Sequence, residues 1–341
     1  MDWKQGYTST LRLYSVNQST WGDGDEIDGL VSASITKDSE SALVEDASIS
    51  LDGEPIKGYV RLVLEAANNA STTRVDIATV LVTAPKRSIN GTLFTYDLEC
   101  YSVLKPASDK VLPSGWYFPE GGDPVFGAFD LLSKSLQCPI DPVESDIRTE
   151  YPIVAESNET ALSMANYLLQ GTNHFIDIDG RGRVQIKEKS SVIKATFDTF
   201  ENDVLMPDIT DETDIFNIPN ILRVSDSSGN YETIYNNDEY SDTSIENIGW
   251  EKWQDEQVTL SNGETLVGKG NAMMEALSKS VRKIGYTREF DPEIRVNDLA
   301  LYMLPKQKII GTFRIISQSL NIGSGIQVKE VATFETSNWK G

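Results

Sequence analysis

Cysteine and histidine are scarce in this sequence of 341 residues, which holds two cysteines, Cys100 and Cys138, and one histidine, His174. Two cysteines are too few for a disulfide framework or a cysteine-rich metal site, so we expect buried free thiols. Nucleophilic catalysis would have to use His174, which follows a predicted helix and is expected to contact its end. No motif such as Gly-x-Ser-x-Gly occurs. The sequence therefore predicts no catalytic site, and the protein is not expected to be an enzyme.

Long hydrophobic runs are also missing. No apolar run approaches the roughly 20 residues of a membrane-spanning helix. The N-terminus, MDWKQGYTST, lacks the basic and apolar regions of a signal peptide. We therefore expect that the protein has no membrane anchor. We also expect that it assembles in a cytoplasm. Apolar residues make up 39% of the chain, which is enough for sizeable cores in about two to four domains.

Basic residues are few, with 30 Lys and Arg against 52 Asp and Glu, which gives a net charge of −22. Affinity for nucleic acid comes from cations that neutralise phosphates, so this chain should repel DNA. Such charge is usually only a solvated surface. It can also let a polyanion pass close by without sticking.

Alternating apolar and polar residues, typical of short antiparallel strands, fill residues 7–104. The pair Asn90-Gly91 is a strong hairpin-turn signal. This first segment is predicted to be an all-β barrel or sandwich.

Prolines and glycines after Leu104 mark a new region. Asp123 and Pro124 are typical of a helix N-cap and first helical position. A second helix is expected to be capped by Asn158 and to end at Gly171. A strand hairpin over 175–189 closes this region.

Acidic residues dominate Thr199 to Glu256, where 15 Asp and Glu face only two basic residues, Arg223 and Lys252. Strands return in the last part of the chain. The hairpin pattern of residues 77–102 recurs at 310–336, which indicates a duplicated β-domain, although amphipathic hairpins can also look alike by chance.

Two stretches resemble ligand-binding loops but fail at one position each. In FIDIDGRGRVQIKEK, Asp177, Asp179 and Glu188 match an EF-hand template, but Arg181 stands where an oxygen ligand is needed and both flanks alternate as strands do. We interpret it as a hairpin whose Asp179-Gly180 and Arg181-Gly182 pairs supply positive φ angles and whose Glu188 is exposed.

The second stretch, GETLVGKGN, has the spacing of a phosphate-binding P-loop. Gly270 replaces the magnesium-binding Ser or Thr, so a polar loop before a helix is expected instead. No metal and no cofactor is predicted.

The fold class that follows is mixed and mainly β (α+β), with two barrel-like antiparallel β-domains flanking a small α/β middle domain. The closing β-domain is expected to include strands from about 215–235 as well. The predicted segments are the first β-domain at 1–105, the middle domain at 106–190, an acidic linking region at 191–294 with a helix over 270–285, and closing strands at 295–341.

This order of segments resembles the tail hub, or baseplate hub, proteins of long-tailed bacteriophages and related injection machines. The resemblance rests on LVSASITKDSESALVEDASISLDG near the N-terminus and on IVAESNETALSMANYLLQGTNHFIDIDGRGRVQIKEK, where an E-T-A-L helix precedes a hairpin with a D-G turn. It covers essentially the whole chain and includes no catalytic signature.

The resemblance implies a homotrimeric ring that adapts a sixfold tail tube to a threefold tail tip in the virion. Implied partners are a tail tube or distal tail protein above, a spike or fibre protein below and a tape measure protein in the channel. DNA would pass without tight binding. Candidate channel-lining acids are Asp208, Asp211, Glu212 and Asp214.

The alternative is a receptor- or carbohydrate-binding β-rich tail-tip protein. It would use the aromatic residues of GWYFPEGG and GWEKW to stack on sugars. A tail-associated hydrolase is a third possibility, disfavoured by the missing nucleophile and base motifs.

Overall fold

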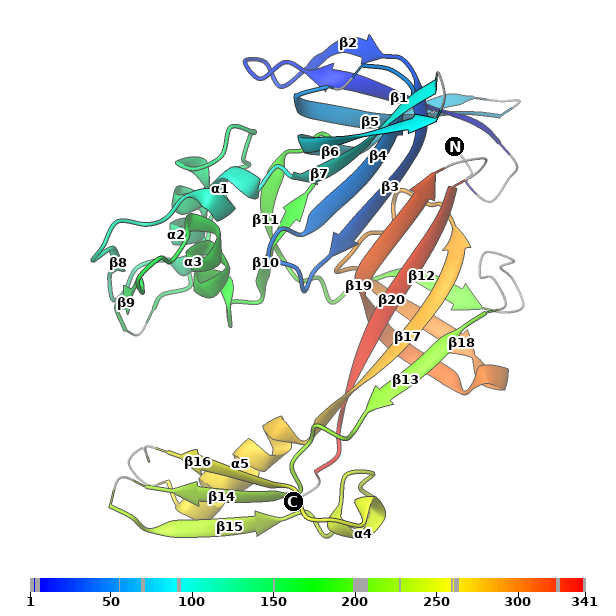
Figure 1. The fold of residues 1–341 in the computed structure, drawn as a ribbon. Helices are drawn as coiled ribbons and strands as arrows, with labels where there is room; N and C mark the ends of the chain where they lie inside the picture. Colours follow the sequence, from blue (N-terminus) through cyan, green and yellow to red (C-terminus); the bar gives the residue numbers. More distant parts are fainter. Residues whose placement is uncertain are drawn as a thin grey trace. The chain divides into compact units, whose positions relative to one another are not determined.

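The computed structural model divides the chain into two compact units, unit 1 (Met1–Pro207 and Tyr286–Val331) and unit 2 (Asp208–Gly285 and Ala332–Gly341). It is mainly β with a minority of helix, as the sequence predicted (Figure 1). No described helix is both long and apolar enough to cross a bilayer. The structure describes residues 3, 7–54, 56–68, 71–90, 93–149, 151–198, 208–226, 228–258, 260, 264–322 and 326–339.

Seven strands of unit 1 form an antiparallel run with the hydrogen-bonded order β3-β4-β7-β6-β5-β1-β2. Strands β2 and β3 stand at opposite ends of this run, yet only two residues join them, so the sheet must curl back on itself in a barrel-like manner. The turn at Gly91, between β6 and β7, lies outside the described residues. The strands are β1 (Thr8–Val16), β2 (Asp23–Ile27), β3 (Leu30–Asp38), β4 (Glu45–Leu51), β5 (Gly58–Ala67), β6 (Thr72–Asn90) and β7 (Leu93–Ser102).

The alternation of buried and exposed side chains shows which face of the sheet forms the core. On β4 the even-numbered side chains are exposed or half-buried, whereas Ala47, Ile49 and Leu51 are buried. Strand β5 is buried along most of its length, including Arg61. A charged side chain at this position needs buried partners, which are described below.

The middle of unit 1 carries short helices and two small two-stranded sheets, of which β10–β11 is a hairpin. Its elements are α1 (Lys105–Asp109), β8 (Tyr117–Phe118), α2 (Pro124–Ser133), β9 (Ile153–Val154), α3 (Ala161–Leu169), β10 (His174–Ile178) and β11 (Val184–Glu188). Asp123 caps α2 as predicted, and its side chain accepts hydrogen bonds from Val125 N and Phe126 N. Gly171 follows α3 with φ +83, also as predicted.

The predicted cap of α3 was wrong. Asn158 has φ +67 and lies outside the helix, and Thr160 is the N-cap. Its hydroxyl accepts from Ser163 N while the Ser163 hydroxyl accepts from Thr160 N, which forms a capping box. A serine at the third helical position takes the role usually filled by Glu or Gln.

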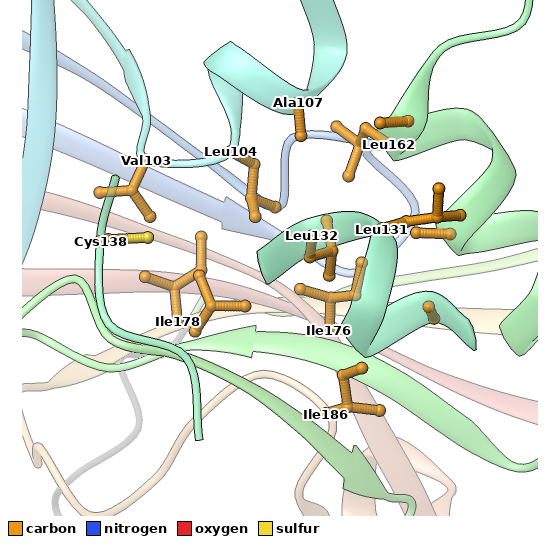
Figure 2. Packing of buried hydrophobic residues seen from close by; sticks show 14 of the residues in the cluster. Val103, Leu104, Ala107, Leu131, Leu132, Cys138, Leu162, Ile176, Ile178 and Ile186 are labelled. Carbon is orange, nitrogen blue, oxygen red and sulfur yellow. The ribbon is translucent and has the colours of Figure 1, made fainter. Parts of the chain in front are cut away.

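One hydrophobic core joins these helices to the β10–β11 hairpin and to the neighbouring sheet (Figure 2). Leu131 and Leu132 of α2, Leu162 of α3, and Ile176 and Ile186 of the hairpin all belong to this core. Trp21 and Tyr59, at one end of the curled sheet, belong to the same cluster. The middle region is thus fixed to the first β-run by apolar packing.

The remaining strands of unit 1 extend the same sheet. Strand β19 (Ile309–Ile322) pairs antiparallel with β3 and with β18 (Leu299–Leu304), and β18 pairs parallel with β12 (Ile193–Asp198). A 3-10 turn, η1 (Pro305–Gln307), joins β18 to β19. Strand β20 (Ile326–Ser337) neighbours β19, and β17 (Lys279–Glu289) neighbours β20; both contain residues of the two units.

Unit 2 contains a sheet of its own, with the order β15-β14-β16, and one face packs on α5 (Leu266–Leu277) (Figure 1). This corrects the expectation that strands from about 215–235 complete the second β-domain, because β14 and β15 pair with each other and with β16 instead. The other elements are β13 (Thr210–Asp214), β14 (Ile221–Ser225), β15 (Tyr231–Tyr235), α4 (Ile245–Ile248) and β16 (Trp253–Gln257).

The helix predicted over 270–285 begins and ends earlier. Thr265 caps α5 through Gly268 N, and the helix ends at Leu277. From Lys279 onward buried and less buried residues alternate as in a strand, with Ile284 and Tyr286 inside. The stretch GETLVGKGN is also partly helical. A Cβ on its Gly270 would lie 2.8 Å from Ile234 Cγ1, so this glycine lets α5 pack closely on the sheet.

Candidate functional site: an acidic strand and a docked hairpin turn

The residues that resembled a calcium loop form the hairpin predicted as the alternative, β10 paired with β11. Lys187 Nζ contacts Asp177 at 2.6 Å, Arg183 N donates to Asp179 Oδ1 at 2.9 Å, and Glu188 is exposed. Arg181 projects to Asp76, with Nε and Oδ2 2.8 Å apart. Of the three carboxylates of the template, Asp177 is therefore paired with a lysine and Asp179 accepts a backbone hydrogen bond, whereas Glu188 points to solvent. The described residues include no cluster of three or more acidic, His or Cys side chains placed to hold a metal.

The turn of this hairpin is held by a buried arginine of β5. Arg61 is 2% exposed, and its Nη2 donates to the Arg181 carbonyl at 3.0 Å and to the Trp21 carbonyl at 3.1 Å. Its Nε donates to the Thr79 hydroxyl, which in turn donates to the Gly180 carbonyl at 2.9 Å. A single guanidinium thus binds both the sheet and the turn, since it has five donors in a fixed plane.

Two glycines of the turn have different roles. Gly182 has φ +72, as predicted, whereas Gly180 does not have a positive φ and that part of the prediction was wrong. A Cβ at Gly180 would lie 1.7 Å from the Asp76 carbonyl oxygen, so only glycine lets the turn approach β6 this closely. Gly180 is therefore required for the close approach of the turn to β6, and Gly182 for its positive φ angle.

Alternating charges surround this docking point. Asp23 Oδ1 contacts Arg61 Nη1 at 2.5 Å and Asp23 Oδ2 contacts Arg74 Nη2 at 2.5 Å, while Asp76 accepts from both Arg74 and Arg181. Burial alone would raise the pKa of Asp23, but the hydrogen bonds from Arg74 and Arg61 outweigh it and hold that pKa below its usual value. The network keeps Asp23 ionised and the turn in place.

A second buried charge network lies in the other half of unit 1. Arg288 Nη2 and Glu330 Oε1 are 2.6 Å apart, and both side chains are at most 1% exposed. Gln318 donates to Oε1 at 2.6 Å, and the Tyr286 hydroxyl donates to Oε2 at 2.5 Å. Burial raises the pKa of Tyr286 well above its usual value, so this phenol stays a donor. These partners were not predicted, although Arg288 and Glu330 stand at inward positions of alternating strands.

The two cysteines and the histidine, the scarce side chains of this sequence, lie apart from one another in the chain and have separate surroundings. Cys100 and Cys138 are free and buried, as predicted, and burial raises the pKa of each thiol to about 12. His174 Nδ1 lies 2.6 Å from the carbonyl oxygen of Thr172, which is beyond the last turn of α3. The histidine therefore contacts the loop after the helix and does not cap the helix itself.

Three of the four candidate channel acids share strand β13, on which all five residues are exposed, and Asp208 lies exposed two residues before it. The strand pairs antiparallel with β17, with Asp211 opposite Ile284 and Glu212 opposite Lys283. Side chains alternate between the two faces of a strand. Glu212 and Asp214 therefore point to one face and Asp211 to the other, so the acids do not form one continuous row.

Asp211 is neutralised locally. Arg282 donates from Nε to its Oδ1 at 2.8 Å and from Nη2 to its Oδ2 at 2.7 Å, a two-pronged ion pair. The hydrogen bond from Arg282 is the main reason that the pKa of Asp211 is lowered. Asp214 caps the following turn by accepting from Phe216 N and Asn217 Nδ2. A charged wall on this strand would depend mainly on Asp208, Glu212 and Asp214.

Exposed aromatic rings gather on the face of the β15-β14-β16 sheet that α5 leaves open. Tyr235 and Trp253 flank Ile221 in the ladder and are 46% and 45% exposed. Arg223 lies 5.1 Å above the Trp253 ring. Of the aromatics in GWYFPEGG, Tyr117 is 63% exposed, whereas Trp116 and Phe118 pack partly against the middle core.

Comparisons with protein-family models and with curated proteins give no match. Solved structures do match. The 43 kDa tail protein of prophage MuSo2 from Shewanella oneidensis is 13% identical with a TM-score of 0.64, covering 94% of this chain and 97% of that protein. A tail protein from Neisseria meningitidis is 9% identical with a TM-score of 0.63, covering 97% of both chains.

A chain of the Francisella PdpA–VgrG complex is 11% identical with a TM-score of 0.58, and the match covers 99% of this chain but 60% of that one. At these identities the likeness concerns the fold. The chain therefore has the fold of phage tail proteins and of a related VgrG complex, as the sequence resemblance implied.

Proposed function

We propose that this chain is a structural, non-enzymatic protein of a phage tail tip or baseplate, in which three copies form a hub ring around a central channel. The observation that carries the proposal is the shared fold with two tail proteins over almost the full length of all three chains. The ring would bind a tail tube or distal tail protein above and a spike or fibre protein below. A tape measure protein would occupy its channel before ejection.

The arrangement of hairpins supports an adaptor between sixfold and threefold symmetry. The long hairpins β6–β7 and β19–β20 belong to one sheet and are linked through β3 and β4. Two related β-halves per copy would present six halves in a ring of three copies. Rotational symmetry of this kind requires each copy to use the same interfaces.

The molar mass in solution tests whether three copies associate. Purified full-length protein is expected to sediment at about 113 kDa, three times the 37.8 kDa of one chain, and to show a threefold ring with an open centre in electron micrographs. Light scattering after size exclusion gives the mass independently of shape. A monomer across the micromolar range, or a closed trimer without a channel, would contradict the hub proposal.

We also propose that the negative charge serves DNA passage, since a trimer would carry −66, three times −22. Only acids near the passing DNA matter, because the Debye length is about 8 Å at physiological salt. Reversing Asp208, Glu212 and Asp214 to lysine should leave tail assembly intact and slow DNA ejection about tenfold, as lysines bind phosphates. Ejection is measured by dye uptake into released DNA.

The matched control for this reversal is the triple change of exposed Glu54, Glu120 and Glu144 to lysine, which alters the net charge equally. It should leave the ejection rate unchanged. Equal rates for both triple variants and the parent would mean that the acids near β13 do not line the channel.

The alternative function, carbohydrate or receptor binding, is favoured by one observation, the exposed Tyr235 and Trp253 beside Arg223 in unit 2. Aromatic rings with neighbouring polar groups suit stacking on sugars. A compact trimer that binds glycans through these residues would support the alternative. A ring with an open channel supports the hub.

A further inference from the structure

A groove of about 560 Å³ lies in the middle region of unit 1, between the outer edge of β9 and helix α3. Its walls carry Tyr151, Val154 and Tyr167, which are 74%, 63% and 55% exposed. Buried Met164 forms part of its floor. Two tyrosines and a valine are thus exposed around one hollow, an arrangement that suits a binding groove.

The groove is acidic as well as aromatic. Glu156 and Glu159 line it, and neither carboxylate forms an ion pair with a described lysine or arginine. Most arginines of unit 1 are already paired, as at Asp23 and Asp76. Two unpaired carboxylates beside tyrosine rings favour a cationic partner through charge and cation–π attraction.

The backbone at the groove disfavours strand addition. Ala155 N donates to the Trp116 carbonyl beside the antiparallel pair of β8 and β9, and backbone groups alternate in direction along a strand. Alternation from Ala155 turns the backbone groups of Val154 and Pro152 outward, and Pro152 has no N–H to offer a further strand. A two-residue strand with a single outward N–H offers little for a further strand to pair with, so recognition is expected to depend mainly on side chains. Aromatic-lined grooves of this kind fit the polyproline II helix, which needs no backbone ladder.

We propose that this groove binds an extended, proline-containing peptide segment that carries lysine or arginine. Tyr151 and Tyr167 contact the proline rings, and Glu156 and Glu159 bind the cations. The segment belongs to another protein. This site is separate from the acidic strand β13 and does not depend on the hub proposal.

The test uses full-length protein and three fluorescein-labelled nine-residue peptides in 0.15 M salt, made of three repeats of Pro-Pro-Arg, Pro-Pro-Glu or Ala-Ala-Arg. Fluorescence anisotropy should show saturable binding of the first, at least about tenfold tighter than that of the other two. Equal binding of the Pro-Pro-Arg and Ala-Ala-Arg peptides would show mere attraction to an acidic protein and would overturn the proposal. So would absence of saturable binding up to about 1 mM.

Variants locate the binding. Tyr167→Ala and Tyr151→Ala should each weaken Pro-Pro-Arg binding about tenfold, and the double change of Glu156 and Glu159 to Gln should weaken it about three- to tenfold and reduce its salt dependence. All four side chains are at least partly exposed, so folding, checked by circular dichroism, should persist. Tyr240→Ala with Glu239→Gln, an exposed pair in unit 2, is the matched control and should not change binding. A control variant that weakens binding as much as the groove variants would also overturn the proposal.

Discussion

Replacing Glu330 by alanine is expected to lower the free energy of unfolding by about 3 to 5 kcal/mol, the usual cost of leaving one member of a buried ion pair alone. Arg288 would lose its carboxylate partner, 2.6 Å away, in a site where it is 1% exposed. Gln318 and Tyr286 would each lose an acceptor. The loss is measured by urea denaturation followed by circular dichroism.

Two further variants isolate the cause of this effect. Glu335→Ala changes an exposed acid on the same strand, β20, and should alter stability by no more than about 0.5 kcal/mol. Replacing Arg288 and Glu330 together by methionine removes both charges and should recover much of the loss. If Glu330→Ala were no worse than Glu335→Ala, the network would not stabilise the fold.

Substituting Gly180 by alanine should destabilise the protein by about 3 kcal/mol or more, because overpacking and broken buried hydrogen bonds combine. The new Cβ would lie 1.7 Å from the backbone oxygen of Asp76, so the turn must move away from the sheet. That movement would break the bonds from Thr79 to the Gly180 carbonyl and from Arg61 to the Arg181 carbonyl. Trp21 Nε1 also donates to the Arg181 carbonyl at 2.7 Å, so tryptophan fluorescence should report the change.

Gly53→Ala is the matched control, since its Cβ would make only an ordinary contact, 3.7 Å from the Asp28 carbonyl oxygen. Its melting temperature should lie within a degree or two of that of the parent protein, because the free energy of unfolding is expected to change by about 0.5 kcal/mol or less. Equal melting of the two variants would show that the turn has room to adjust and that the tight approach at Gly180 is not required.

Local signals in the sequence were sufficient for many elements. Asp123 followed by Pro124 gave the start of α2, Gly171 gave the end of α3, and alternation around the Asp179–Gly182 turn gave the β10–β11 hairpin. These features depend on residues within a few positions of each other. Composition and segment order then led to the fold class that the structure shows.

Other features depend on partners far along the chain and could not be predicted. Residues 221–235 show strand patterns, but nothing local says that β14 pairs with β16 and not with the larger sheet. Arg61 and Arg181 are 120 residues apart, so no local sequence pattern signals their contact. The clue that existed was an arginine inside the apolar run YVRLVLEAA, which implied a buried partner without naming it.

The pairing of β3 with β19 has a consequence for synthesis. The β3 edge is completed by residues near the end of the chain, since Ser39 N and the Ile316 carbonyl bond across a separation of 277 residues. At about 5 to 20 residues per second, a ribosome needs between about 14 and 55 s to make that stretch. During this time β4 to β7 can pair among themselves while one edge of β3 stays open. An unpaired strand edge can join another chain, so nascent copies close together on one messenger RNA are exposed to mispairing at this edge until β19 emerges.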